Sequence, residues 1–339
     1  MTDKKKYLLN ILLILTIGGL SLYFSIGGEY KEVWNAITSA KIGWLIVMVA
    51  VMFVYFVVDA LSLWYFGRFY KKDYSFKQAF TNSISGIFFN GVTPFASGGQ
   101  FAQVYIFNKQ GIPPTESSSI LLMCFICYQS VLVAYTGLVL IIKHNYFLHE
   151  GAGIMSLALL GFLINFLVIL GLFFGAKSRR FQNFITNTVV KGLSKIHIVK
   201  DYETTSFKIQ NYLADFRTQI DLLTKNISVL AKSSLCNFIK LTVLYSMPFF
   251  ACKALNVNVG WNSFLNYIGL CSFIYLINAF LPIPGASGGS EGCYILLFNF
   301  LGTVAASSTM FLWRFVSYYM GMIVGGIVFS VSKEINRRD

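Results

Sequence analysis

The sequence TPFASGGQ at residues 93–100 is matched much later in the chain by PIPGASGGSEG at residues 282–292. Both copies contain the pattern Pro-x-Ala-Ser-Gly-Gly, and both lie in strongly apolar parts of the chain. Proline has no backbone N–H to donate and glycine tolerates φ values that other residues avoid, so each copy predicts a break in regular helix. The duplication predicts two equivalent breaks in one fold.

Composition fixes the class of protein around these breaks. Of the 339 residues, 56% are hydrophobic and 12% are charged, and several apolar runs reach the roughly 20 residues that a helix needs to cross a bilayer core of about 30 Å. Because lipid cannot hydrogen-bond to exposed backbone, the sequence predicts an all-α polytopic membrane protein that forms a single transmembrane domain over residues 1–339. The expected spans are 7–26, 43–67, 117–142, 152–176, 228–252, 262–281 and 302–331.

The first apolar run, Tyr7 to Ile26, follows three lysines and resembles a secretory signal peptide in its position. It is longer than the usual apolar region of such a peptide, and no A-x-A cleavage site follows it. We therefore predict that it stays in the protein as a helix.

Basic residues predict how the chain is oriented. If the N-terminus is cytoplasmic, most of the 27 Lys and Arg fall in segments on the inner side, which places both termini in the cytoplasm and the protein in the cell membrane. This holds only if Lys77 and Lys109 share one face. The stretch from 78 to 108 must then enter and leave on the same side. Its apolar part, 78–92, is about 22 Å of helix, too short to cross and suited to a re-entrant hairpin.

The order of elements repeats along the chain. Residues 43–142 and residues 228–331 both predict a helix, a broken hairpin with the Pro-x-Ala-Ser-Gly-Gly pattern and a second helix, and the two units start on opposite faces. The sequence therefore predicts an inverted-topology repeat with two re-entrant broken-helix hairpins. The second hairpin is less constrained, because 262–281 is long enough to span by itself, and its loop carries no Lys or Arg to place it.

Broken helices of this kind present free N–H groups and a positive dipole end at mid-membrane, where an anionic group is favoured. The alternative interpretation is that the glycines only make a loop or a close helix contact. Because the pattern occurs twice at corresponding positions, we expect a phosphate to be cradled there. The predicted cradle consists of Ser97, Gly98, Gly99, Ser287, Gly288 and Gly289.

Charge is costly inside a predicted span or in the first turn of a half-helix and therefore indicates function, and four of the ionisable residues placed there are candidates. Arg314 is predicted to donate charge-assisted hydrogen bonds to a phosphate, and Glu291 to face a cationic headgroup. Asp59 and Lys240 are accessory candidates. The alternative is two structural ion pairs, Glu291 with Arg314 and Asp59 with Lys240.

The segment 177–226 is the only sizeable polar region, and its apolar residues recur at helical spacing. It predicts two amphipathic helices whose basic faces lie against the anionic cytoplasmic leaflet, so the excess of positive charge needs no nucleic acid as a partner. The six cysteines lie in apolar surroundings and predict neither a disulfide framework nor a metal site. All three histidines fall in loops, and we predict no catalytic residue and no cofactor.

The sequence resembles the membrane portion of the lysylphosphatidylglycerol synthase and flippase family, the multiple peptide resistance factor type, over nearly its whole length. The residues that carry the resemblance are Asn90, Thr93, Pro94, Gly98, Gly99, Tyr105, Gly111, Ile112, Pro113, Pro282, Pro284, Gly285, Gly288, Glu291, Arg314, Tyr318 and Tyr319. The resemblance adds Asn90, Thr93 and Gln100 to the expected substrate site. Family members often have Gly-Gly-Glu and then an arginine at the first motif, where this chain has Gln100 and Gln103.

The resemblance implies a phospholipid flippase or scramblase that displays an aminoacylated or related phospholipid, of the lysylphosphatidylglycerol type, in the outer leaflet. It implies no capacity to make that lipid, since the soluble aminoacyl-transferase domain of the family's long members does not follow Asp339. A membrane-embedded lipid-modifying transferase and a small-solute transporter stay open as alternatives. The headgroup, the energy source and the formation of a homodimer are left open.

Overall fold

The computed structural model describes residues 30–93, 97–149, 152–178, 202–278 and 284–332, together with single residues between 180 and 191 and residue 335. Every regular element in these ranges is helical. The longer helices are α2 (Tyr30–Thr38), α3 (Ile42–Tyr70), α4 (Phe76–Gly91), α5 (Gly98–Lys109), α6 (Pro114–Ile142), α7 (His144–His149), α8 (Ala152–Lys177), α11 (Tyr202–Lys225), α12 (Ile227–Ala254), α13 (Phe264–Asn278), α14 (Gly289–Leu297), α15 (Thr303–Arg314) and α16 (Met320–Val331).

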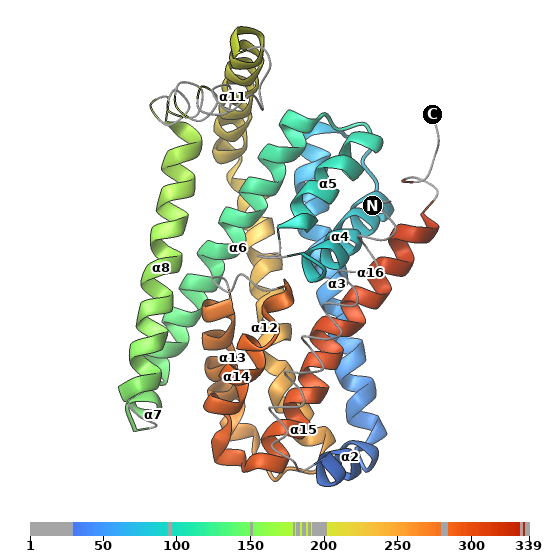
Figure 1. Ribbon diagram of the computed structural model, residues 1–339, viewed down its shortest axis with the longest axis vertical. Coiled ribbons are helices and arrows are strands. Elements are labelled where there is room, and N and C mark those ends of the chain that lie inside the picture. The colour runs from blue at the N-terminus through green and yellow to red at the C-terminus, as the bar shows by residue number, and fades with distance from the viewer. Residues whose placement is uncertain are drawn as a thin grey trace.

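Four helical stretches in the described part are long and apolar enough to cross a bilayer: α3, α6, α12 and the run Thr303–Val331, in which a π-helical turn joins α15 to α16. A shorter apolar stretch, Leu159–Gly171, lies within α8. The prediction of an all-α polytopic membrane protein is confirmed. In Figure 1, α3 and the α15–α16 run extend from the end near α2 toward the end near α11, and α6 and α12 run the opposite way.

Some predicted features lie outside the described residues. They are the first apolar run Tyr7–Ile26 and the lysines before it, Pro94 and Pro282 of the two motifs, and most of the first amphipathic helix expected after residue 177. The second amphipathic helix is described as α11, which packs against α6. Tyr212 of α11 donates to Ser118 of α6 at 2.8 Å.

Helices α3 and α12 lie side by side and carry much of the apolar core. Pro248 lies inside α12 and cannot donate to the carbonyl of Leu244. The buried Cys271 of α13 lies there instead, with its Sγ 3.7 Å from the Leu244 oxygen. A thiol that the sequence predicts to be only apolar packing therefore also fills a gap in the backbone hydrogen bonding.

The two ends of the α4–α5 segment lie next to each other. Lys71, just before α4, donates from Nζ to the Gln110 carbonyl at 2.8 Å, and Tyr74 donates to Gln110 Oε1 at 2.9 Å. Gln110 in turn donates to the carbonyl of Gln78 at 3.0 Å. The start of α4 is fixed by a capping box, in which Ser75 and Gln78 accept from each other's backbone N–H.

The α13–α14 segment also returns to its starting point. The ring of Tyr267, early in α13, lies 5.4 Å from that of Phe298, just after α14. Phe298 stacks on Tyr294 at 4.4 Å, and Tyr294 stacks on Trp313 of α15 at 5.0 Å. Helix α13 is described over 15 residues, up to Asn278, and the last residues of the span expected at 262–281 lie outside the described part of the chain. Figure 1 places the α4–α5 pair toward the α11 end and the α13–α14 pair toward the α2 end.

Small residues let α16 approach α4 closely. A Cβ on Gly325 would collide with the carbonyl oxygen of Ile84 and lie 2.9 Å from the Cβ of Phe88, and one on Gly321 would lie 3.2 Å from Ile87. Glycines four residues apart are a common way to bring two membrane helices together. This contact fixes α4 to the last long helix.

We therefore expect Gly325→Leu to lower the free energy of unfolding by about 1–3 kcal/mol, because the side chain must push α16 away from α4. Gly171→Leu is the matched control, since nothing lies within 4 Å of a Cβ at this exposed glycine of α8. Thermal unfolding of the purified variants in detergent measures both. Equal stability of the two variants would contradict the close contact.

Candidate functional site

The start of α14 is capped by its own carboxylate. Glu291 lies in the first turn of α14, and its Oε2 accepts from the backbone N–H of Gly288 at 2.7 Å. The positive end of the helix dipole favours an anion at this position. Gly288 has a φ of +88°, which an L side chain adopts only with strain, so the turn into α14 requires glycine.

Arg314, on the last long helix, binds the turn 285–288 that forms the tip before α14. Its Nε donates to Glu291 Oε1 at 2.7 Å, and its Nη2 lies 2.7 Å from the carbonyl oxygen of Gly285 and 3.4 Å from Ser287 Oγ. Its guanidinium also lies 4.4 Å from the centre of the Tyr318 ring. The side chains of Glu291 and Arg314 are 1% and 6% exposed, so the two charges are buried together. Two such charges are tolerated in the interior because each satisfies the other.

The site lies midway along the bundle. Arg314 ends α15 and falls near the middle of the 29-residue run Thr303–Val331. A π-helical turn, Phe315–Tyr319, follows it directly, and such turns are frequent at functional sites. Tyr318 in this turn donates to the Gly91 carbonyl at 2.9 Å. The end of α4 and the tip before α14 therefore meet at one place.

The first motif is capped differently. At the start of α5, Gly98 donates its N–H to Thr93 Oγ1 at 2.8 Å, and Gly99 donates its N–H to Asn90 Oδ1 at 3.0 Å. The expectation that these two N–H groups are free is therefore wrong. Side chains a few residues upstream accept from them, as is usual for the orphan donors of a helix start.

The glycines of the two motifs serve different needs. A Cβ on Gly98 would collide with Thr93, and one on Gly99 would collide with Asn90, so both leave room for the capping side chains. Nothing lies within 4 Å of a Cβ at Gly288, where the space is open.

The remaining predicted residues differ in exposure. Ser97 and Gln100 are exposed, Gly289 is half-buried and Ser287 is buried. The structure thus brings Ser287, Gly288, Glu291 and Arg314 into direct contact, while Asn90, Thr93, Gly98 and Gly99 form a second contact set.

The accessory residues Asp59 and Lys240 also form an ion pair, with 2.7 Å between Asp59 Oδ1 and Lys240 Nζ. Both pairings that the sequence leaves open as structural alternatives are therefore formed. Sequence reasoning missed three groups: Tyr318, which links the motifs, Gly285, whose carbonyl binds Arg314, and Ser83, which donates to Asp59. The two tyrosines at 318 and 319 appear in the resemblance, but nothing in the pattern assigns a contact to them.

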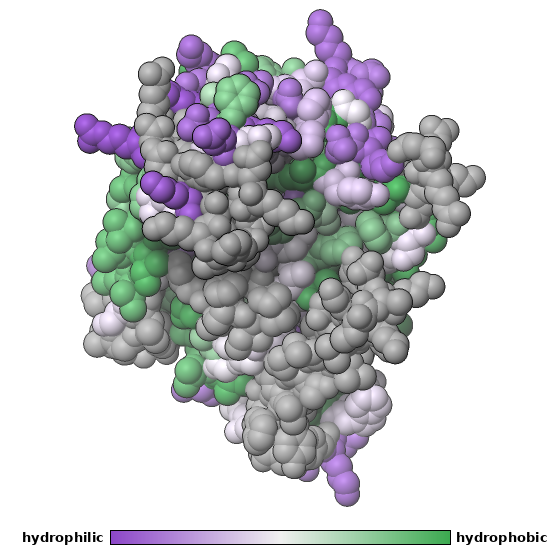
Figure 2. Space-filling view, turned by 45° about the horizontal axis from the view of Figure 1, so that its top comes forward, coloured by the Kyte–Doolittle hydropathy of each residue, from purple (hydrophilic) through white to green (hydrophobic). Residues whose placement is uncertain are grey.

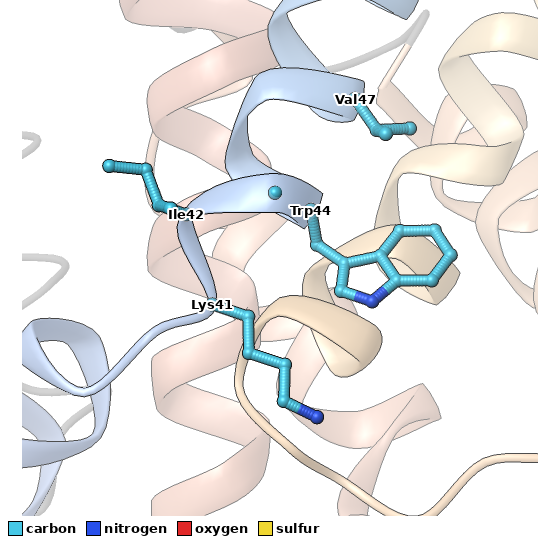
Figure 3. Close-up of a pocket in the computed structure, with 5 residues that line it drawn as sticks. Lys41, Ile42, Trp44 and Val47 are labelled. Carbon is cyan, nitrogen blue, oxygen red and sulfur yellow. The ribbon is translucent and has the colours of Figure 1, made fainter.

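One open pocket lies elsewhere, at the start of α3, and contains none of the predicted site residues. It is lined by Lys41, Ile42, Gly43, Trp44 and Val47. Figure 3 shows Trp44 and Val47 extending to one side of α3 and Ile42 to the other. A lysine and a tryptophan at the end of a long apolar helix are typical of a membrane interface.

We expect Glu291→Gln and Arg314→Gln each to lower the free energy of unfolding by about 3–5 kcal/mol, because each leaves one buried charge without its partner. The double variant is expected to recover most of that loss, since no uncompensated charge remains. Thermal unfolding in detergent measures all three proteins. If the single variants are as stable as the parent protein, the ion pair between Glu291 and Arg314 is not formed in the membrane protein.

Comparison with known proteins agrees with this architecture. The family model described as the lysylphosphatidylglycerol synthase TM region matches residues 8–325. A UPF0104 membrane protein of Archaeoglobus fulgidus is 23% identical over 310 residues, which cover 88% of this chain and 89% of that relative.

Proposed function

Because the chain belongs to the family of the lysylphosphatidylglycerol synthase transmembrane region, we propose that it moves a phospholipid between the leaflets of the cell membrane. The proposed cargo is an aminoacylated or related phospholipid, and the proposed role is that of a flippase or scramblase. The observation that carries the proposal is the buried charged site around Glu291 and Arg314, which lies midway along a bundle of long, mainly apolar helices.

We also propose an inverted-topology repeat, an architecture that suits this function. The proposed units, about 43–142 and about 228–331, each begin and end with a long helix, and the two long helices enclose a pair of short ones. The short pairs α4–α5 and α13–α14 lie toward opposite ends of the bundle (Figure 1). Each pair returns to its starting end, so we propose that both are re-entrant hairpins whose tips reach mid-membrane. We propose that both units form one transmembrane domain.

The orientation follows from charge. Arg68, Lys71 and Lys109 lie at the end of the bundle where α5 and α11 are found, and Figure 2 shows hydrophilic residues gathered there. We propose that this end faces the cytoplasm, with both termini on the same side. Helix α11 would then lie near the anionic headgroups of the inner leaflet, as the segment 177–226 is expected to do.

The residue roles in this proposal follow from the contacts. Glu291 and Arg314 hold the tip and shape the site, rather than meeting the headgroup as isolated charges. Gly288 and Gly289 leave open or half-buried backbone beside that tip, where a headgroup can approach closely. At the other tip, Ser97 and Gln100 are the exposed polar residues, while Asn90 and Thr93 keep the start of α5 in place. The acyl tails would stay in the bilayer during transfer.

The test is leaflet exchange of fluorescent phospholipids by the protein reconstituted in vesicles. We expect the parent protein to accelerate exchange and Gly288→Leu to abolish it, because leucine fills the open space and cannot easily adopt a φ of +88°. Gly292→Leu is the matched control, since this glycine is exposed, also has open space around it and has no positive φ.

No exchange by the parent protein, together with uptake of a soluble solute, would replace the proposal with a small-solute transporter. Turnover of a lipid donor without exchange would replace it with a transferase. If Gly288→Leu and Gly292→Leu both exchange lipid as fast as the parent, the second motif is not a headgroup site and serves only in packing.

A further inference from the structure

A second charged cluster lies inside the bundle, separate from the tip held by Arg314. The Nζ of Lys240, on α12, lies 2.7 Å from Oδ1 of Asp59, on α3. Ser83, on α4, donates to the other oxygen of the same carboxylate at 2.5 Å. The ammonium also lies 4.7 Å from the centre of the Tyr128 ring, on α6, and 5.9 Å from that of Tyr55. A carboxylate and two aromatic rings from two helices thus surround one ammonium group.

This arrangement is the chemistry that recognises an alkylammonium ligand. Aromatic faces attract cations, and a carboxylate accepts their N–H groups. In the structure the cage holds the protein's own ammonium, that of Lys240. The carboxylate is held in place independently by Ser83, so it does not depend on Lys240 for its position.

The cluster is less enclosed than the pair at the tip. The side chains of Asp59 and Lys240 are 21% and 12% exposed, against 1% and 6% for Glu291 and Arg314. The planar guanidinium of Arg314 donates to both the Glu291 carboxylate and the Gly285 carbonyl, whereas Lys240 carries a compact ammonium on a flexible side chain. The Lys240 ammonium can therefore move off the carboxylate without dismantling a larger network.

We propose that the Asp59–Lys240 pair opens to hold a phospholipid headgroup that carries one primary ammonium and one phosphate. The headgroup ammonium replaces that of Lys240 in the cage, and the displaced Lys240 binds the phosphate. The contacts then run from the Asp59 carboxylate to the headgroup ammonium, and from the headgroup phosphate to the Lys240 ammonium. Each charge meets an opposite one, and no net charge is added to the interior. This inference rests on the proposed lipid transport and names the class of headgroup.

The distance between the charges sets the selectivity. At 2.7 Å the contact with Asp59 is a hydrogen bond, which a primary ammonium can make and a trimethylated one cannot. A headgroup without an ammonium group cannot displace the Lys240 ammonium from the Asp59 carboxylate and the two aromatic rings. The cluster therefore selects ethanolamine-type phospholipids, which carry one primary ammonium and one phosphate, over choline and glycerol phospholipids.

The experiment compares short-chain lipids as ligands of the purified full chain in detergent. Dihexanoyl phosphatidylethanolamine, phosphatidylcholine and phosphatidylglycerol are titrated, and the rise in Tm is followed with concentration. We expect the ethanolamine lipid to act at a concentration at least about tenfold lower than the other two, the difference that one charged hydrogen bond makes. Soluble glycerophosphoethanolamine is a further arm, which distinguishes a lipid site from a site for any phosphoamine.

Two changes test the cage itself. The double variant Asp59→Asn, Lys240→Met removes both charges together, so no unpaired charge is left to unfold the protein, and it should lose the preference for ethanolamine. Tyr128→Leu keeps both charges and should weaken the preference. Tyr65→Leu is its control, because the Lys232 ammonium of α12 lies 5.3 Å from the centre of the Tyr65 ring of α3, and this second lysine–tyrosine contact should not affect headgroup choice.

Equal response to all three lipids, or an unchanged preference in the double variant, would overturn the proposal and leave the pair as a link between α3 and α12. The failure of transport is distinguishable from this outcome. If the protein prefers the ethanolamine lipid but exchanges no lipid in vesicles, the proposed headgroup site is supported and the proposed flippase function is contradicted. If the protein exchanges lipids with no such preference, the proposed function is supported and the proposed headgroup site is contradicted.

Discussion

The buried ion pair between Glu291 and Arg314 is the interaction on which the rest of the site depends. A charge near the middle of a membrane span is costly, and here each charge offsets the other while the guanidinium also binds the Gly285 carbonyl. The pair therefore fixes the tip of one short-helix pair to the middle of the last long helix. Tyr318, one turn further on, extends this link to the Gly91 carbonyl at the end of α4.

The two related motifs cap the helices that follow them by different chemistry. In the second, a carboxylate from inside the helix accepts from Gly288, and arginine secures that carboxylate. In the first, neutral side chains cap the helix start, with Thr93 and Asn90 accepting from the two glycines. Only one of the two tips is charged.

Much of this arrangement could be predicted from the sequence, and the failures have physical reasons. The pairing of Arg314 with Glu291 was open from the sequence as an alternative to headgroup contacts, because neither charge is stable alone at that depth. The caps on α5 were missed because the phosphate hypothesis left its N–H groups free, although Asn and Thr are common capping residues. The π-helical turn at Phe315–Tyr319 has no sequence signal that we recognise.

The central claim is that two hairpins enter the membrane from opposite faces and meet at one mid-membrane site. The most direct measurement is labelling of single cysteines, introduced into the full chain after its six native cysteines are replaced, with a membrane-impermeant maleimide. We expect cysteines at positions 77 and 109 to be labelled only from the cytoplasmic side, and cysteines at positions 262 and 299 to be labelled only from the outside. Labelling of Lys77→Cys and Lys109→Cys from opposite faces would contradict it.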